Sequence, residues 1–177
     1  ALSDTGADVI ALQEVWPDKY KIQFVNEFKK LGYPYSFFKD PPTKSFFRGI
    51  VGNGLVIISK IPLSIPDLPR DQVLSFSDYT RPDEYFSAKG ALHVNLDLGN
   101  QKILSLYNTH MGAVSFEPDL KRYNPKHEAV RQDQAHELFN FIQATKQSHP
   151  IILIGDFNVN FQKSSDLSIS LAKAFDY

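Results

Sequence analysis

The sequence predicts an α/β domain in which helices cover sheets of buried strands. Short apolar runs at 9–12, 54–59 and 151–154 are each typical of a strand that is buried on both faces. A further pair of segments, 91–98 and 102–108, predicts a β-hairpin. Helical patterns separate these strands along the chain. Because strands that are buried on both faces need cover, a layered α/β sandwich is the expected architecture.

The composition is that of an ordinary soluble globular protein. Of the 177 residues, 42% are hydrophobic and 22% are charged, and a single domain over 1–177 is expected. No apolar run approaches the roughly 20 residues that span a bilayer. The formal net charge of −1 disfavours binding that rests on many phosphate contacts. The lack of cysteine excludes disulfides and thiolate chemistry, and it fits both a cytosolic and a disulfide-free secreted protein. Oligomeric state is left open.

The first part of the chain is expected to hold one helix between buried strands. Asp18 can cap the first turn of this helix, and Gly32 can end it. A short strand at 35–38 and a loop at 41–49 then lead to the strand at 54–59. The apolar stripe of the helix repeats every three residues and consists of Ile22, Val25, Phe28 and Leu31.

The middle of the chain is expected to be a long loop or edge segment, 64–84, followed by the hairpin. Gly99–Asn100 is a two-residue turn signal between the hairpin strands. One face of the first hairpin strand is apolar and consists of Leu92, Val94, Leu96 and Leu98. The other face consists of His93, Asn95 and Asp97.

After the hairpin, the segment 111–125 is expected to be irregular and 126–146 to be a helix. A last helix is predicted to begin at Ser164 or Ser165. The residues of the long helix that should face inward are Val130, Leu138, Phe141, Ile142 and Thr145. Those of the last helix are Leu167, Leu171 and Phe175.

Asp156 and Asn158 follow the strand 151–154 and flank Phe157. In extended backbone, residues two apart point the same way, so the two polar side chains should share one face while Phe157 returns to the core. A carboxylate beside an amide suits a hard cation and the phosphate that it activates. An Asx turn after a strand explains the same residues without any function.

Two other predicted strands also end in polar residues. Glu14 follows the apolar run 9–12, where burial is costly without a partner or a cation, although it also fits a glutamate that points into water. His110 follows the second hairpin strand, a place where a histidine is often only structural. Together the strand ends offer Glu, His, Asp and Asn, the groups that a magnesium-dependent phosphoryl hydrolase needs.

Three motifs occur in order along the chain: Leu12-Gln13-Glu14, Asn108-Thr109-His110 and Gly155-Asp156-Phe157-Asn158. The segment 52–62 and the spacing of Arg131 and Gln134 accompany them. Each motif is short, but the ordered set resembles the endonuclease/exonuclease/phosphatase (DNase I-like) superfamily over essentially the whole chain.

The resemblance implies a four-layer α/β sandwich with two central sheets, and it implies roles for the polar strand ends. Glu14 would hold an essential divalent metal, Mg²⁺ or, given oxygen-rich ligands, Mn²⁺. Asp156 would bind or orient the attacking water, and Asn158 would contact the scissile phosphate. His110 would donate to a phosphate oxygen and stabilise developing charge. Supporting or phosphate-binding roles would belong to Asn108, Lys89, Arg131 and Gln134.

Within the superfamily, the chain is similar to the neutral sphingomyelinase-like phosphodiesterases. The segment 86–92 resembles the Lys-Gly segment that opens a strand in those enzymes, and residues 108–111 before a long insert are also similar. Hydrolysis of a phospholipid headgroup is therefore favoured. A nuclease or DNA-repair phosphodiesterase and a catalytically degenerate binding module are the alternatives. Lys89 is equally explained as a lysine at the entry of a strand.

Peripheral membrane contact is a further expectation. The pairs Phe37–Phe38 and Phe46–Phe47 would form an aromatic edge for a lipid substrate, although such residues more often belong to the core. A basic cluster would meet anionic headgroups or a nucleic-acid backbone, or would form a solvated loop: Lys121, Arg122 and Lys126.

Two motifs of the superfamily are not found in the chain. The family has an asparagine on a strand before the glutamate motif, and no asparagine precedes Glu14. It also has a later Asp-His motif, and none of the five histidines follows an aspartate. The catalytic fold is therefore expected to be incomplete at both ends, with weak metal binding and low activity of this segment alone.

Overall fold

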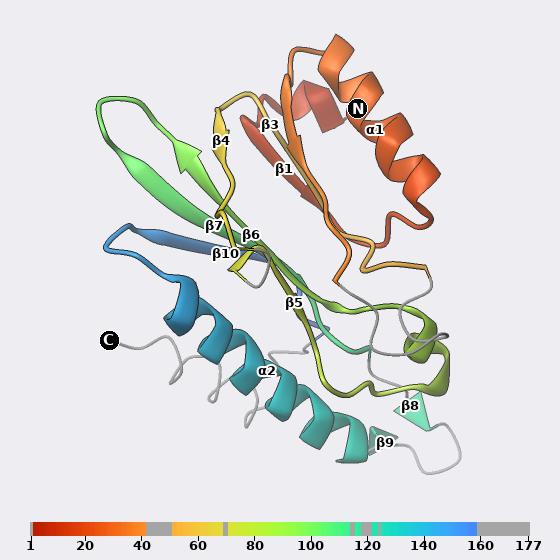
Figure 1. Cartoon of the computed structure of the whole chain (residues 1–177). Helices are drawn as coiled ribbons and strands as arrows, with labels where there is room; N and C mark the ends of the chain where they lie inside the picture. The colour runs from red at the N-terminus through yellow and green to blue at the C-terminus, as the bar shows by residue number, and fades with distance from the viewer. Residues whose placement is uncertain are drawn as a thin grey trace.

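The computed structural model describes residues 2–41, 51–68, 71–113, 116–117, 122–123 and 125–158. In these residues two main β-sheets pack face to face, and one helix covers the outer side of each sheet (Figure 1). A 3₁₀ helix, Leu2–Thr5, precedes the first strand. The layers run helix, sheet, sheet, helix, so the predicted four-layer α/β sandwich is confirmed.

The first sheet is antiparallel and has the strand order β1–β3–β2. Its strands are β1 (Val9–Leu12), β2 (Tyr35–Phe37) and β3 (Val56–Ser59). Helix α1 (Asp18–Lys30) lies over the outer face of this sheet, where Phe28, Val56 and Ile58 are buried together. All of β3 is buried, because it has a strand on either side and a packed layer on both faces.

The second sheet has the order β10–β7–β6–β4, and β5 also pairs with β6. The predicted hairpin is formed by β6 (Gly90–Asp97) and β7 (Ile103–His110). Strand β10 (Ile151–Asp156) runs parallel to β7, while β4 (Leu63–Ser64) and β5 (Val73–Ser75) run antiparallel to β6. Helix α2 (Pro125–Thr145) covers the outer face. The remaining elements are a 3₁₀ helix (Pro82–Phe86), β8 (Phe116–Glu117) and β9 (Arg122–Tyr123).

The central core lies between the two sheets. It draws Ile57 from the first sheet and Leu92, Val94 and Leu106 from the second. Because side chains alternate along a strand, the neighbouring residues point outward to the helices. Tyr107 accordingly packs against α2 with Leu138, Phe141 and Ile142.

The aromatic pair Phe37–Phe38, at the end of β2, belongs to this packing. Phe37 is buried in the central core, and Phe38 packs against the cluster beneath α1. The two residues therefore do not form an exposed aromatic edge, and the core interpretation is confirmed for them.

Helix α1 differs from the prediction in its first residue and in its buried face. Asp18 is the first residue of the helix rather than its cap. Ile22 and Leu31 are 52% and 55% exposed, whereas Lys21 is fully buried. The cause is electrostatic, because Nζ of Lys21 lies 2.8 Å from a carboxylate oxygen of Asp40 and 3.0 Å from one of Asp18. A paired lysine can therefore occupy the inner face that the sequence assigned to isoleucine.

The second sheet also corrects three details. The central residues of the hairpin turn are Asn100 and Gln101, one position later than predicted, with φ angles of 51° and 62°. Leu98 is 49% exposed at the end of the predicted core face. The prediction that β10 is buried on both faces is wrong, because Ile152 is 42% exposed. In the described residues β10 is an edge strand. The segment 64–84 was expected to be a long loop or an edge segment. Within it, Val73–Ser75 forms a strand that pairs with β6, so the edge segment is confirmed there.

Several predictions fall outside the described residues. These are the loop over 42–49 with Phe46 and Phe47, the basic residue Lys121, and the last helix from Ser164 or Ser165 with Leu167, Leu171 and Phe175. Among the helices that are described, none is both long enough and apolar enough to cross a bilayer.

Candidate active site

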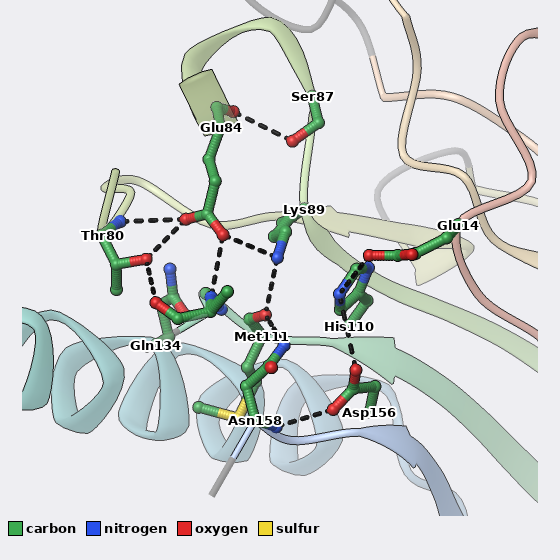
Figure 2. A network of polar contacts seen from close by, with 12 residues as sticks. Glu14, Thr80, Glu84, Ser87, Lys89, His110, Met111, Gln134, Asp156 and Asn158 are labelled. Carbon is green, nitrogen blue, oxygen red and sulfur yellow. Dashed lines mark hydrogen bonds and ion pairs between the residues drawn. The ribbon is translucent and has the colours of Figure 1, made fainter. Parts of the chain in front are cut away.

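Three strand ends from both sheets meet at one edge of the sandwich. In the parallel pair β7–β10, His110 and Asp156 are direct partners in the register. Glu14 reaches the same place from the end of β1 in the other sheet (Figure 2). The fold thus brings together three of the residues that the sequence selected.

Asn108 ties the two sheets together beneath this edge. Its side chain is fully buried, and its Nδ2 donates to the carbonyl oxygens of Leu12 (3.0 Å) and Val56 (3.3 Å). Its Oδ1 accepts a hydrogen bond of 2.8 Å from Nε2 of Gln13. These hydrogen bonds therefore hold the end of β1, just before Glu14, against the end of β7, just before His110.

The imidazole of His110 lies between two carboxylates. Its Nε2 is 3.8 Å from Oε1 of Glu14 and 3.8 Å from Oδ2 of Asp156 (Figure 2). These side chains are 64% and 48% exposed, whereas His110 is buried. Both distances are too long for a direct hydrogen bond. A small gap thus separates the imidazole from each carboxylate.

Burial keeps His110 neutral. Within the described residues, neither ring nitrogen has a hydrogen-bond partner. Burial, and then the positive charge of Lys89, lower the pKa of His110 from 6.5 to about 4, although Asp156 and Glu84 act in the opposite direction. At neutral pH the ring therefore keeps one N–H donor that no described protein group uses.

Asp156 and Asn158 reach the site by a different geometry from the one predicted. Asn158 has a φ of 52°, so the backbone is not extended there. Its backbone N–H donates to Oδ1 of Asp156 (2.8 Å). This is the Asx turn that would explain these residues without any function. Its Nδ2 donates to the carbonyl oxygen of Met111 (2.9 Å). Phe157 packs against the core beneath α2, as predicted.

Lys89 lies beside this site in a buried ion pair. Its Nζ is 2.7 Å from Oε1 of Glu84 and donates to the carbonyl oxygen of Met111 (3.1 Å). Met111 O therefore receives hydrogen bonds from both Lys89 and Asn158 (Figure 2). Lys89 is more than a lysine at a strand entry, because it holds the backbone that follows His110.

Glu84 is the principal residue of this region that the sequence did not reveal. Its carboxylate also accepts hydrogen bonds from the backbone N–H of Ala113 (2.8 Å) and from Oγ1 (2.6 Å) and N (3.2 Å) of Thr80. Burial alone would raise the pKa of Glu84, but the hydrogen bonds from Lys89, Thr80 and Ala113 hold it below 4.5. Glu84 lies in the segment 64–84, which has no periodic pattern. The one signal in the sequence that could have identified it is its position five residues before Lys89.

The two predicted residues of α2 have different positions. Gln134 accepts a hydrogen bond from Gly112 N (2.8 Å) and donates to Asp78 O (2.9 Å), so it braces the same backbone segment as Glu84. Arg131 pairs with Glu128 on its own helix. Within the described residues, its Nε and Nη1 have no hydrogen-bond partner. The structure thus brings Gln134, but not Arg131, into the network of Figure 2.

The donor set around His110 fits a hard divalent cation. In the part of the chain that the structure describes, neither Glu14 nor Asp156 is paired with a lysine or an arginine. No group of three or more His, Asp or Glu side chains in that part forms a ready-made metal cage. The protein groups that could contact a cation here are therefore the two carboxylates of Glu14 and Asp156. Mg²⁺ is commonly held by one or two carboxylates, with water and phosphate oxygens completing its shell.

Comparisons with known proteins show which family the chain resembles along most of its length. The model of the Endonuclease/Exonuclease/phosphatase family matches residues 1–167. Sphingomyelin phosphodiesterase 2 of Homo sapiens is 30% identical over 176 residues, which are 97% of this chain and 37% of that protein. The putative neutral sphingomyelinase of Drosophila melanogaster is 26% identical over 159 residues, which are 89% of this chain and 33% of that protein.

Solved structures show the same fold. The crystal structure of sphingomyelinase C from Streptomyces griseocarneus aligns with a TM-score of 0.74 and 21% sequence identity, and it covers 97% of this chain and 57% of that one. The match to the family model confirms the resemblance inferred from the motifs. The chain spans about a third of the length of the human and fly relatives.

Proposed function

This chain belongs to the endonuclease/exonuclease/phosphatase family, and on that basis we propose that the protein is a divalent-metal-dependent phosphodiesterase that cleaves the headgroup from sphingomyelin-like phospholipids. The observation that carries the proposal is the approach of Glu14 and Asp156 to one nitrogen of His110, at 3.8 Å each. The names of the relatives support the choice of a phospholipid substrate.

Glu14 would hold the metal, Mg²⁺ or Mn²⁺, and Asp156 faces the same space. Their carboxylates are exposed, and within the described residues no lysine or arginine neutralises them. When bound, such an ion polarises a phosphoryl oxygen and balances the charge that develops during hydrolysis. The ring of His110, being neutral, adds no charge that would repel a cation.

The other groups of the site would position the water and the phosphate. Oδ1 of Asp156 is engaged by the backbone of Asn158, so Oδ2, which faces His110, is the oxygen that would orient the attacking water. His110 would donate its N–H to a phosphate oxygen. The amide of Asn158 has a second N–H that would contact the same phosphate. Donors fixed in this way stabilise transition-state charge without reorganising.

Lys89, Gln134 and Asn108 would act through other residues. Lys89 and Gln134 fix the backbone at Met111–Gly112, and Asn108 fixes Leu12. They would be positioning residues, because hydrogen bonds to backbone carbonyl oxygens hold the side chain of each.

The test is an assay of the full-length protein with Mg²⁺ on three substrates: sphingomyelin vesicles, bis-p-nitrophenyl phosphate and plasmid DNA. We expect hydrolysis of sphingomyelin and of the aryl diester. Glu14→Gln and Asp156→Asn should each lower kcat by roughly 100-fold to 1000-fold, the usual effect of removing a group that stabilises the transition state. Chelation of the metal should abolish the activity, and added Mn²⁺ should restore it.

Two substitutions provide matched controls. Glu27→Gln and Asp133→Asn make the same chemical changes at exposed carboxylates on α1 and α2, and they should leave kcat unchanged. Cleavage of DNA alone would contradict the substrate and favour a nuclease. Equal rates for the parent protein, Glu14→Gln and Asp156→Asn would contradict the assignment of these residues to the active site.

A further inference from the structure

Glu14 lies in a backbone conformation that residues other than glycine rarely adopt. Its φ angle is 61°, in the left-handed region. Such a conformation costs free energy and persists only where the surrounding structure determines it. The next residue is fixed by a hydrogen bond from Val15 N to Gly54 O (2.9 Å), and Trp16 N donates to Glu14 O (3.1 Å). The conformation of Glu14 is therefore tied to the segment 52–54, which precedes β3.

The segment 52–54 has no room for side chains at its two ends. Gly52 and Gly54 have φ angles of 78° and 67°. A Cβ at Gly52 would overlap the carboxylate of Asp40, and a Cβ at Gly54 would overlap the indole of Trp16. This indole in turn lies beside the imidazole of His110, with ring centroids 6.1 Å apart. A displacement of the segment would therefore be transmitted to the candidate active site.

Asp40 anchors the segment 52–54 to helix α1. Its Oδ1 accepts hydrogen bonds from the backbone N–H of Asn53 (2.8 Å) and from Nζ of Lys21 (2.8 Å). The side chains of Lys21 and Asn53 are both fully buried. Asn53 is held further, because its Nδ2 donates to Lys39 O (2.7 Å) and its Oδ1 accepts from Leu55 N (3.0 Å). A buried charge is tolerated only when it is paired and hydrogen-bonded, so this pair fixes the segment in one position.

The segment 52–54 also contacts the backbone that leads to Lys89. Gly52 O accepts a hydrogen bond of 3.0 Å from Ala88 N, the residue before Lys89. The first residue of the segment is thus bonded next to Lys89, and its last residue is bonded next to Glu14. One short segment therefore holds the backbone on two sides of the candidate active site.

We propose that the segment 52–54 is a positioning element for metal binding, and that Asp40 and Lys21 act through it to hold Glu14 in the left-handed conformation. This inference rests on the proposed function, in which Glu14 holds the metal. A ligand that is already held in place loses little freedom when the ion binds, so this arrangement raises the affinity for the metal. Asp40 acts through the backbone and has no contact with the ion.

The test is the affinity of the full-length protein for Mn²⁺, measured from the electron paramagnetic resonance signal of the free ion, which requires no turnover. Gly52→Ala should displace the segment, because the new Cβ collides with Asp40. We expect the Mn²⁺ affinity to fall by roughly 10-fold to 100-fold, the usual effect of disturbing a group that supports a metal ligand. The kcat at saturating Mn²⁺ should stay near the parent value, since Glu14 itself is retained.

Gly99→Ala is the matched control for the backbone. Gly99 also has a φ of 78°, but nothing lies within 4 Å of the added Cβ. The two variants therefore introduce the same backbone strain, and only Gly52→Ala introduces the collision. Gly99→Ala should leave the Mn²⁺ affinity unchanged.

A second variant removes the anchor without adding backbone strain. Lys21→Met combined with Asp40→Ala removes both members of the pair, so that neither charge is left buried alone. It should weaken Mn²⁺ binding by a similar factor, and it decides the question if Gly52→Ala does not fold. Its control is Lys30→Met combined with Glu27→Ala, which removes an exposed pair of the same helix and should leave the affinity unchanged.

Glu14→Gln separates this inference from the proposed function. It should weaken Mn²⁺ binding more than either variant of the anchor, and parent affinity in Glu14→Gln would contradict the proposed function and the inference together. Loss of binding in Glu14→Gln, with parent affinity in Gly52→Ala and in the double variant, would overturn the inference alone, even if urea denaturation showed both to be less stable. An equal loss in Gly99→Ala would also overturn it, because backbone strain would then explain the effect.

Discussion

Glu84 and the pair Glu14–Asp156 show two opposite uses of carboxylates around the same histidine. Glu84 is 8% exposed, and donors from Lys89, Thr80 and Ala113 satisfy its oxygens. Glu14 and Asp156 are 64% and 48% exposed, and within the described residues neither has a lysine or arginine partner. All three belong to the surroundings of His110, so residue type alone does not separate them.

The difference lies in what each carboxylate has left to bind. A buried charge is tolerated only when it is paired and hydrogen-bonded, and Glu84 meets both conditions. Its task is to hold Lys89 and the backbone at Ala113 in place. Within the described residues, each of the two exposed carboxylates keeps an oxygen that is available to a cation or a water molecule. Under the proposed function, burial and the completeness of hydrogen bonding thus separate the structural carboxylate from the two chemical ones.

The largest effect on stability is expected from Lys89→Met. This change removes the cation from buried Glu84 and one of the two donors from Met111 O. Breaking a buried pair from one side typically costs about 3–5 kcal/mol, because the other charge stays buried without compensation. Urea denaturation of the parent protein and the variant measures the difference in the free energy of unfolding.

Lys30→Met is the matched control for this prediction. Lys30 pairs with Glu27 at 2.7 Å, but the two side chains are 70% and 58% exposed. Exposed pairs contribute about 0–1 kcal/mol, so the control should be nearly neutral. A loss of the same size in both variants would show that the Glu84–Lys89 pair is no more important than a surface pair.

A smaller effect is expected from pH, through His110. Its pKa is about 4 in the folded protein and 6.5 ordinarily, so between these values the unfolded chain binds a proton that the folded chain does not. Stability from this group is therefore complete above pH 6.5 and is lost as the pH falls toward 4, by on the order of 3 kcal/mol. The low pKa of Glu84 adds its own loss only below pH 4.5.

Urea denaturation without divalent metal, between pH 4.5 and 7.5, measures this dependence. His110→Asn should flatten part of the slope, and the remainder is expected from His93, whose pKa is also lowered by burial. An unchanged slope in the variant would show that His110 titrates normally in the folded protein.

The fold was predictable because its signals are local. The apolar runs of β1, β3 and β10 and the alternating hairpin are visible in short windows, and the ends of the strands then locate Glu14, His110 and Asp156. Their meeting also followed from the order of the motifs. Local patterns were not sufficient for β8 and β9, which form a small antiparallel pair in the segment 111–125 that was expected to be irregular.

Pairings between distant residues were not predictable. Glu84 is tied to Ala113, 29 positions later, and Lys21 is buried only because Asp40, 19 positions later, supplies a carboxylate. The positive φ of Asn158 is another such case, because its side chain is held by Met111, 47 positions away. These features depend on which polar group the fold places opposite each residue. The hydrophobic periodicity of the sequence carries no information about such partners.

The smallest effect on stability is expected where the effect on activity is largest. Glu14→Gln and Asp156→Asn keep the shape of exposed side chains, and the amide oxygen of asparagine can still accept the N–H of Asn158. Such surface changes usually alter the free energy of unfolding by within about 0.5 kcal/mol. Measuring urea stability beside kcat in the same preparations therefore separates a chemical role from a structural one. A loss of several kcal/mol would mean that these carboxylates, like Glu84, hold the fold together, and the contrast between the two regions would fail.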